Sequence, residues 1–290
     1  MNGLVYHIAS GQALFTGASL LMLSAFASLG SSALLRRVSS FAFLLGTATV
    51  VIASVALPYW LYAVAALLTA GWIISWRWEK WRRLAVAGMA IGWLVVMLIE
   101  LPHHLLPRLT PAGSRSLTVI GDSITAGIGG DPKSPTWPQV LARQHRLQVQ
   151  DISHVGDTAG KALLRAQAEP ITAPVVLVEI GGNDLLGATS ASQFAIDLEA
   201  LLQFLAAPGR QVVMLELPSL PLYPQYGRIQ RTLARKYRVL LAPKSVLLAV
   251  LAGGDATLDS LHLTAKGHVR MADSIWRLLE PAYDLDGSSA

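Results

Sequence analysis

Ser123 lies where an apolar run meets a glycine-rich loop. Residues 117–120 read Leu-Thr-Val-Ile, and Gly121, Asp122 and Ser123 follow directly. A serine hydroxyl is a weak nucleophile until a neighbouring base takes its proton. Gly121 and Gly127 allow the backbone to turn sharply and to approach a ligand closely. The pattern favours a nucleophile presented at the end of a strand, and the alternative is a plain turn in which Ser123 caps the next helix.

A base for this serine can be sought among the histidines. His262 stands three residues after Asp259, so one short turn could orient both the base and the acid that holds its ring. His268 competes for the role of base, but Ala265 occupies the position three residues before it. His145 and His154 are expected to be surface residues. We therefore propose His262 as the base, with Asp259 to orient it.

The elements that must position these residues follow from the hydrophobic pattern after Ser116. Short β-branched runs alternate with longer helical stretches, which is typical of a parallel sheet covered on both faces. The predicted strands are 117–120, 149–152, 175–180, 212–217 and 239–241, and the predicted helices are 136–146, 160–168, 190–207, 225–236 and 264–280. We expect an α/β fold: a three-layer α/β/α domain over residues 116–290 with a five-stranded parallel, flavodoxin-like sheet.

Sheets of this kind bind ligands beyond the carboxyl ends of their strands. Polar and glycine-rich segments stand at these places: 121–123 after the first strand, 153–160 after the second, 179–186 after the third, and 257–268 before the last helix. The segments bring Ser123, Gly156, Asn183 and the Asp259–His262 pair toward one edge of the predicted sheet. We expect the functional site at that edge.

In these four segments the chain resembles the GDSL, or SGNH, hydrolases. The blocks read Gly121-Asp122-Ser123, Gly156, Gly181-Gly182-Asn183-Asp184 and Asp259-Ser260-Leu261-His262, in the family's order. The sequence of these blocks is most similar to that of the bacterial thioesterase/lysophospholipase/arylesterase branch of the family. There are modest departures: Ile124 replaces the name-giving leucine, Ser153 stands where asparagine is common, and no proline follows His262.

The resemblance implies a serine esterase with a Ser123, His262 and Asp259 triad. It also implies an oxyanion hole made by the amides of Ser123 and Gly156 and the side chain of Asn183, and it implies neither a cofactor nor a metal. A single acid suffices for the triad, so Asp184 is expected to be structural, and Asp157 is expected to form hydrogen bonds within its loop. Trp137 has two open interpretations, as part of the acyl-binding site or as part of the core.

The first third of the chain has a different character. The whole chain is 53% hydrophobic and 14% charged, and the apolar excess is concentrated before Leu105. A helix needs about 20 residues to cross the hydrocarbon core of a bilayer. Four apolar stretches, 11–34, 39–57, 60–76 and 84–101, predict an all-α transmembrane module of about four helices over residues 1–105, followed by a linker over 106–115. A re-entrant hairpin is the alternative for the middle pair, and a cleaved signal peptide is disfavoured because no basic region precedes the first stretch.

Basic residues suggest how this module is oriented. Arg36, Arg37 and the cluster at 77–83 flank the two connections that four spans place on one side. The positive-inside rule assigns that side to the cytoplasm. We expect a multi-pass protein of the bacterial inner (cytoplasmic) membrane with its catalytic domain on the periplasmic, or extracytoplasmic, side. The pair His103 and His104 could bind a metal, but such a pair in a linker is usually a polar interface feature.

Composition narrows the partners. Most of the net charge of +5 comes from the basic residues that flank the membrane, so we expect no nucleic-acid partner. The absence of cysteine excludes disulfides and thiol nucleophiles. The expected partners are membrane lipids and an acyl-ester substrate, either a lipid or a glycan, and a partner membrane protein is possible but unidentified.

The leading functional hypothesis is a membrane-anchored serine esterase or acyl hydrolase that acts on extracytoplasmic acyl esters or thioesters. An acyltransferase or deacetylase of envelope polysaccharide could use the same acyl-enzyme, and a non-catalytic subunit of a membrane assembly is a third interpretation. Four spans exceed what tethering needs. They favour a substrate that is itself embedded in the membrane, although a simple anchor is the alternative.

Overall fold

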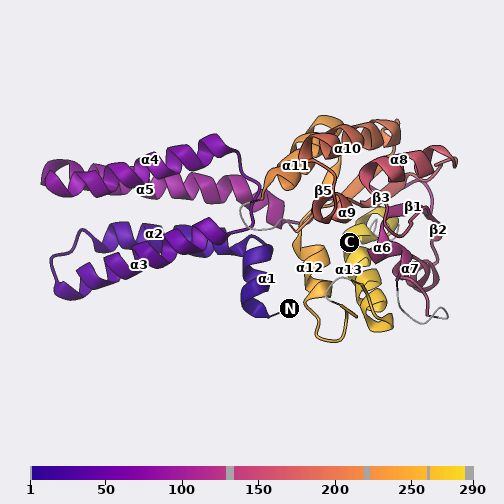
Figure 1. Cartoon of the computed structure of the whole chain (residues 1–290), viewed down its shortest axis with the longest axis horizontal. Helices are drawn as coiled ribbons and strands as arrows, with labels where there is room; N and C mark the ends of the chain where they lie inside the picture. The colour runs from indigo at the N-terminus through magenta and orange to yellow at the C-terminus, as the bar shows by residue number, and fades with distance from the viewer. Residues whose placement is uncertain (1, 129–133, 219–222, 260–261, 285–290) are drawn as a thin grey trace, which may run out of the picture. The chain divides into compact units, whose positions relative to one another are not determined.

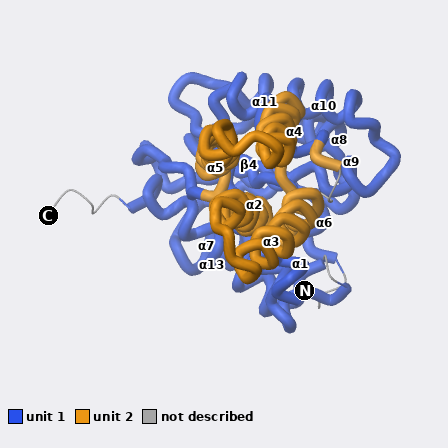
Figure 2. The backbone as a smooth tube through the Cα atoms, turned by 90° about the vertical axis from the view of Figure 1, so that its left-hand side faces the viewer, with its two compact units in different colours: residues 1–6, 105–218, 225–290 blue, residues 7–104, 219–224 orange. Residues whose placement is uncertain are grey.

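The computed structural model describes residues 2–128, 134–218, 223–259 and 262–284. The chain forms two compact units, which are coloured differently in Figure 2. One unit comprises residues 7–104 and 219–224, and is called the helical unit below. The other comprises residues 1–6, 105–218 and 225–290, and is called the catalytic unit.

The helical unit is built from long apolar helices. In chain order the elements are α1 (Gly3–Ala9, which begins in the other unit), α2 (Gln12–Ala27), α3 (Ala33–Ile52), α4 (Tyr59–Ile74), η1 (Ser75–Arg77), α5 (Glu79–Glu100) and η2 (Leu101–His104). Within the described part of the chain, three helices are long and apolar enough to cross a membrane, with a fourth if the bent pair α1 and α2 forms one span. That pair bends by 86°. The turn lies next to Gly11, whose φ of 86° favours glycine.

The first predicted apolar stretch, 11–34, differs from the structure at its end. Helix α2 stops at Ala27, and α3 starts at Ala33 rather than near residue 39. The cause is local, because the Ser32 side chain accepts a hydrogen bond from the Leu35 amide and so caps a new helix. The arginines Arg36 and Arg37 therefore lie in the first turns of α3 instead of in a connection.

Small residues allow the helices of this unit to pack closely. A Cβ atom on Gly17 would lie 2.9 Å from the Gly46 carbonyl oxygen, so α2 and α3 touch through their backbones. The Ser24 hydroxyl donates to the Ser39 carbonyl oxygen at 2.7 Å, which ties the same two helices together. Large apolar side chains on the outer faces, including Phe41 and Leu67, are about 70% exposed. This distribution is expected of helices surrounded by lipid.

The catalytic unit contains a five-stranded parallel sheet (Figure 1). Its order is β2-β1-β3-β4-β5, with β1 (Ser116–Gly121), β2 (Gln148–Asp151), β3 (Val175–Glu179), β4 (Gln211–Leu215) and β5 (Leu240–Ala242). The strands are rich in branched apolar residues because both faces of the sheet are buried. The order places β1 and β3 side by side near the middle, so the loops that follow them meet.

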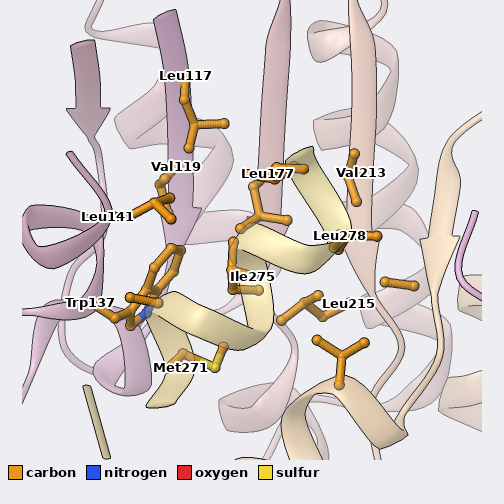
Figure 3. Close-up of a cluster of buried hydrophobic side chains, with 14 of the residues drawn as sticks. Leu117, Val119, Trp137, Leu141, Leu177, Val213, Leu215, Met271, Ile275 and Leu278 are labelled. Atoms are coloured by element: carbon orange, nitrogen blue, oxygen red, sulfur yellow. The ribbon is translucent and has the colours of Figure 1, made fainter. Parts of the chain in front are cut away.

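Helices cover both faces of this sheet. One core lies between the sheet and α7 (Trp137–His145), α12 (Ser245–Leu251) and α13 (Ala265–Tyr283), and Figure 3 shows part of it. The second core lies under α8 (Ala159–Gln167), α10 (Ala191–Leu205) and α11 (Gln225–Tyr237). Two short helices, α6 (Ser123–Ala126) and α9 (Gly182–Leu186), follow β1 and β3 directly. The α/β/α fold and the parallel sheet predicted from the sequence are confirmed.

Residues 106–115, which we expected to be a linker, pack partly onto the catalytic unit. Leu109 and Ala112 are buried in the first core. The Ala112 amide donates to the Ala282 carbonyl oxygen at 2.7 Å, and Gln211 bonds both backbone groups of Thr110. These contacts form because the apolar side chains of Leu109 and Ala112 are buried in the same core as the last turns of α13. Leu109 and Ala112 therefore take part in the packing of the catalytic unit.

Candidate active site

Ser123 is the first residue of α6, directly beyond the end of β1. Asp122 caps this short helix, since its Oδ1 accepts a hydrogen bond from the Ile124 amide at 3.0 Å. Gly127 closes the turn with a φ of 78°, and its amide donates to the Ser123 carbonyl oxygen at 3.0 Å. The positive φ of Gly127 is the sharp turn that the sequence predicted, whereas Gly121 leaves room for the Thr125 side chain, and Ser123 itself is half-buried.

The two other predicted oxyanion residues lie in the neighbouring loops. Gly156 follows β2 with a φ of 78°, and among the described residues, its chain neighbours aside, no atom lies within 4 Å of where its Cβ would be. The His154 amide donates to the Gly121 carbonyl oxygen at 3.1 Å, which fixes this loop to the end of β1. Asn183 lies in α9, after β3.

The Asn183 side chain links all three loops. Its Nδ2 donates to the Asp157 carbonyl oxygen at 3.0 Å and to Asp122 Oδ2 at 3.3 Å. Asp157 adjoins Gly156, and Asp122 adjoins Ser123. These bonds place Asn183 beside the loops that carry Ser123 and Gly156, and the role of the three residues as oxyanion donors stays a prediction. An amide nitrogen has two hydrogens, so an oxyanion would have to share or replace one of these bonds, and the longer bond to Asp122 is the weaker.

A buried carboxyl pair lies behind the serine, and sequence reasoning missed half of it. Glu179, the last residue of β3, is 2% exposed and accepts a hydrogen bond from Thr125 Oγ1 at 2.8 Å. It also shares a side-chain hydrogen bond with Asp122. Glu179 therefore holds the residue before Ser123 and the second residue after it. The sequence did contain a signal for Glu179, because it is an acid at the end of an otherwise apolar run, Val-Val-Leu-Val-Glu.

Burial changes the acidity of this pair. Desolvation raises the pKa of Asp122 to about 6, against hydrogen bonds from Ile124 and Glu179 that lower it. Desolvation also raises the pKa of Glu179 well above its ordinary value, and the neighbouring charge of Asp122 adds to this effect. Two carboxyl groups that share a hydrogen bond do not ionise together readily, because their negative charges repel. Asp122, whose pKa the hydrogen bond from Glu179 lowers, therefore ionises before Glu179.

The Asp259 and His262 side chains form the pair that the sequence predicted. His262 Nδ1 lies 2.6 Å from Asp259 Oδ2, and the His262 amide donates to Asp259 Oδ1 at 2.9 Å. The positive charge of a protonated His262 lowers the pKa of Asp122, so the imidazole lies within electrostatic range of the carboxyl next to Ser123. Among the described residues no hydrogen bond joins Ser123 to His262. Ser260 and Leu261, which lie between Asp259 and His262 in the chain, are outside the described residues.

His268, the competing base, has a different environment. It is 6% exposed, and its Nδ1 accepts a hydrogen bond from the Trp137 amide at 3.2 Å. Burial lowers its pKa. Its Nε2 lies 3.4 Å from where a Cβ on Gly127 would be, so His268 packs beneath the serine loop. This role is structural, and no carboxylate orients the ring in the described part of the chain.

Trp137 belongs to the core. Its side chain is fully buried between the sheet and α13, beside Leu141 and Met271 (Figure 3). Of the two interpretations that the sequence left open, this burial favours the core. A substrate would have to displace core side chains to reach the indole.

The remaining acids and histidines mainly support the loops. Asp157 is 1% exposed and accepts two hydrogen bonds from Arg165, at 2.8 and 3.2 Å. Asp184 Oδ2 accepts from the Ala159 amide at 2.9 Å, which joins α9 to the start of α8. His154 is exposed, whereas His145 stacks on Trp276 with ring centroids 3.7 Å apart. Within the described ranges no three histidine, aspartate or glutamate side chains are grouped as a metal site.

The fold and this arrangement define a three-layer α/β hydrolase with its serine at the end of the first strand. The profile of the GDSL-like lipase/acylhydrolase family matches residues 119–270, just over half of the chain. The chain therefore belongs to this family, and is a serine hydrolase of the GDSL, or SGNH, type.

Known relatives match 59–64% of the chain. The chain is 28% identical to Esterase TesA of Pseudomonas aeruginosa over 187 residues, 59% of this chain and 90% of the relative. It is 29% identical to thioesterase 1/protease 1/lysophospholipase L1 of Escherichia coli K12 over 201 residues, 64% of this chain and 95% of the relative.

Solved structures agree with the fold. A crystal structure of TesA matches with a TM-score of 0.50 and 27% identity, covering 57% of this chain and 98% of that one. The esterase EstA of a Pseudoalteromonas species matches with a TM-score of 0.53 and 20% identity, covering 58% and 97%. At that identity the second match supports the fold alone.

Proposed function

We propose that the protein is a membrane-anchored serine esterase that hydrolyses acyl esters or thioesters outside the cytoplasm, with Ser123, His262 and Asp259 as its triad. The observation that carries the catalytic part is the 2.6 Å contact between Asp259 and His262 in a loop within electrostatic range of the Ser123 turn. The relatives named esterase, thioesterase and lysophospholipase support acyl esters and thioesters as the substrate class.

In this mechanism His262 Nε2 takes the proton of Ser123 Oγ as the oxygen attacks the acyl carbonyl carbon. Asp259 accepts from Nδ1, which fixes the ring and stabilises the imidazolium. The negative charge on the carbonyl oxygen meets the amides of Ser123 and Gly156 and the Asn183 side chain. Nε2 then protonates the leaving alcohol or thiol, and a water activated by His262 releases the acid from the acyl-enzyme.

The buried pair next to the serine contributes to this chemistry. Near pH 7 Asp122 carries a charge within electrostatic range of His262, so it favours the imidazolium that forms during attack. Asp122 also accepts from Asn183, which keeps the amide oriented before the oxyanion develops. Glu179 holds Asp122 and Thr125 in place.

The two histidines provide the test of the base. Turnover of p-nitrophenyl acetate by full-length protein in detergent should fall about 10²–10⁴-fold in His262→Gln, because the general base is lost. His268→Gln keeps an acceptor for the Trp137 amide and should retain most activity. Loss of turnover in His268→Gln with survival in His262→Gln would contradict the assignment.

The membrane part of the proposal rests on the apolar helices and on the arginines at one end of them. The three to four candidate spans carry large exposed apolar side chains, and Arg36, Arg37, Arg82 and Arg83 lie in the first turns of α3 and α5. These observations favour a multi-pass protein whose α2–α3 and α4–α5 connections face the cytoplasm. The catalytic unit would then lie on the opposite side.

Cysteine labelling tests this orientation cleanly, because the chain has no cysteine of its own. A membrane-impermeant maleimide on intact spheroplasts should label Ala207→Cys in the catalytic unit and spare Ser31→Cys between α2 and α3. Both positions are exposed in the structure. The reverse labelling pattern would overturn the orientation.

A further inference from the structure

A groove runs between α3 and α4 of the helical unit, and its character changes along its length. At one end a pocket of about 290 Å³ is lined by Ser28, Arg36, Ser39, Ser40, Trp76 and Arg82. A second pocket of about 320 Å³ shares Ser39, Ser40 and Trp76 with the first and continues past Phe43, Leu44 and Ile73. A third of about 340 Å³ shares Phe43 and Ile73 with the second and continues to Val50, Val51 and Tyr62.

The first pocket carries positive charge that nothing in the described chain neutralises. Arg36 donates one hydrogen bond, to the Ser31 carbonyl oxygen, and no ion pair involves Arg36 or Arg82 among the described residues. Arg82 Nε is buried without a hydrogen-bond partner in that same part of the chain. A buried guanidinium donor without a hydrogen bond is unfavourable, so the site favours an acceptor that supplies the missing bond.

The helix ends strengthen this preference. Helices α3 and α5 both begin at this end of the unit, and their amino-terminal partial charges are positive. The first turn of α3 contains no acid, and the one acid of the first turn of α5 is Glu79. Arginines are unfavourable beside such charges, and an anion between them is favourable. The Ser40 hydroxyl is exposed at the same place and could donate to it.

The rest of the groove requires an apolar occupant. Beyond Trp76 its walls are Phe43, Leu44 and Ile73, followed by valine, alanine and threonine side chains of α3 and α4. Figure 2 shows α2 to α5 nearly end-on. Contiguous exposed apolar surface of this kind does not stay in water. A molecule with an anionic head and a hydrocarbon tail fits both the arginine-lined end of the groove and its apolar part.

We propose that the groove between α3 and α4 binds an anionic phospholipid, with its phosphate between Arg36 and Arg82 and an acyl chain along Phe43 and Ile73. This goes beyond the proposed esterase activity and rests on the placement of the helical unit in a membrane. The proposal concerns the helical unit alone, to which every lining residue belongs. Each guanidinium group can donate two parallel hydrogen bonds to two oxygen atoms of a phosphate group.

Native mass spectrometry of the full-length protein with added phosphatidylglycerol or phosphatidylethanolamine tests the proposal. Phosphatidylglycerol should be retained preferentially. Arg36→Gln combined with Arg82→Gln should weaken its retention about tenfold or more. The matched control is Arg37→Gln with Arg83→Gln, which removes the same charge from the same helix turns outside the groove and should retain the lipid.

A second variant tests the apolar end. Ile73→Trp fills the groove where the second and third pockets meet and should also reduce retention, while inorganic phosphate should not compete. Equal loss in both arginine pairs would show a general surface attraction, and displacement by phosphate alone would show a free-anion site. A lipid-free dimer would show a second copy in the groove. Each of these results overturns the proposal, and turnover of p-nitrophenyl acetate, measured in parallel, reports separately on folding and on the esterase.

Discussion

Asp122 should contribute to a fall in the stability of the catalytic unit as the pH rises from about 4 to 7, and Asp122→Asn should remove that contribution while the contribution of Glu179, whose pKa burial also raises, remains. The folded-state pKa of about 6 lies above the ordinary value of 3.8, so the folded protein binds this proton more tightly than the unfolded chain does. The stabilisation is therefore complete below pH 3.8 and is lost as the pH rises through about 6. One pKa unit corresponds to about 1.4 kcal/mol, so the shift is worth about 3 kcal/mol.

Urea unfolding of residues 105–290 measures this effect. Both hydrophobic cores of the unit consist of residues 109–283, so this segment is expected to fold alone. Trp137 and Trp276 are its only tryptophans and report unfolding by fluorescence. The free energy of unfolding of Asp122→Asn, minus that of the wild type, should rise by about 3 kcal/mol between about pH 4 and 7.

Asp255 supplies a control of opposite sign. The Lys266 hydrogen bond and the charge of Arg270 lower its pKa, so its contribution to stability is present at neutral pH and is lost as the pH falls. Asp255→Asn should therefore cost most at neutral pH. A difference for Asp122→Asn that stays constant across this range, or that follows the sign of Asp255→Asn, would refute the assignment of a buried, proton-binding carboxyl pair.

Three further changes probe the site and its support. Asn183→Ala should lower kcat about 10²–10³-fold with a smaller effect on KM, because it removes one oxyanion donor, and a pure rise in KM would contradict this role. Trp137→Ala should destabilise the catalytic unit by about 3–5 kcal/mol in urea unfolding, whereas a loss of substrate affinity at unchanged stability would return Trp137 to the acyl site. Thr125→Val should cost about 1–3 kcal/mol in the same assay, since it leaves Glu179 without its hydroxyl donor, and an unchanged midpoint would exclude that bond.

Periodicity was sufficient to predict the catalytic fold. The five strands and five long helices occur within a few residues of their predicted bounds, because branched apolar runs and amphipathic stretches are separated by turn residues. Helix α12 was missed, since a seven-residue apolar helix such as Ser245–Leu251 cannot be distinguished from a buried strand by period. The packing of Leu109 and Ala112 was also missed, because it depends on α13, far along the chain.

The site was predictable where chemistry depends on local spacing. Asp259 and His262 are three residues apart, and their contact follows from one turn. Glu179 was not predictable in this way, since its partners Asp122 and Thr125 come from a neighbouring strand and helix. The groove of the helical unit likewise depends on how α3 and α4 face each other, which the hydropathy of each helix does not reveal.

The central claim is that Ser123 is the nucleophile that His262 activates. Trypsin should release residues 116–133 as one peptide, bounded by Arg115 and Lys133, and this peptide contains two serines, Ser116 and Ser123. After incubation of the full-length protein with a fluorophosphonate, tandem mass spectrometry should find a single phosphonyl adduct on Ser123, formed far more slowly in His262→Gln. An adduct on Ser116 or on another peptide, or equal labelling rates with and without His262, would contradict the account.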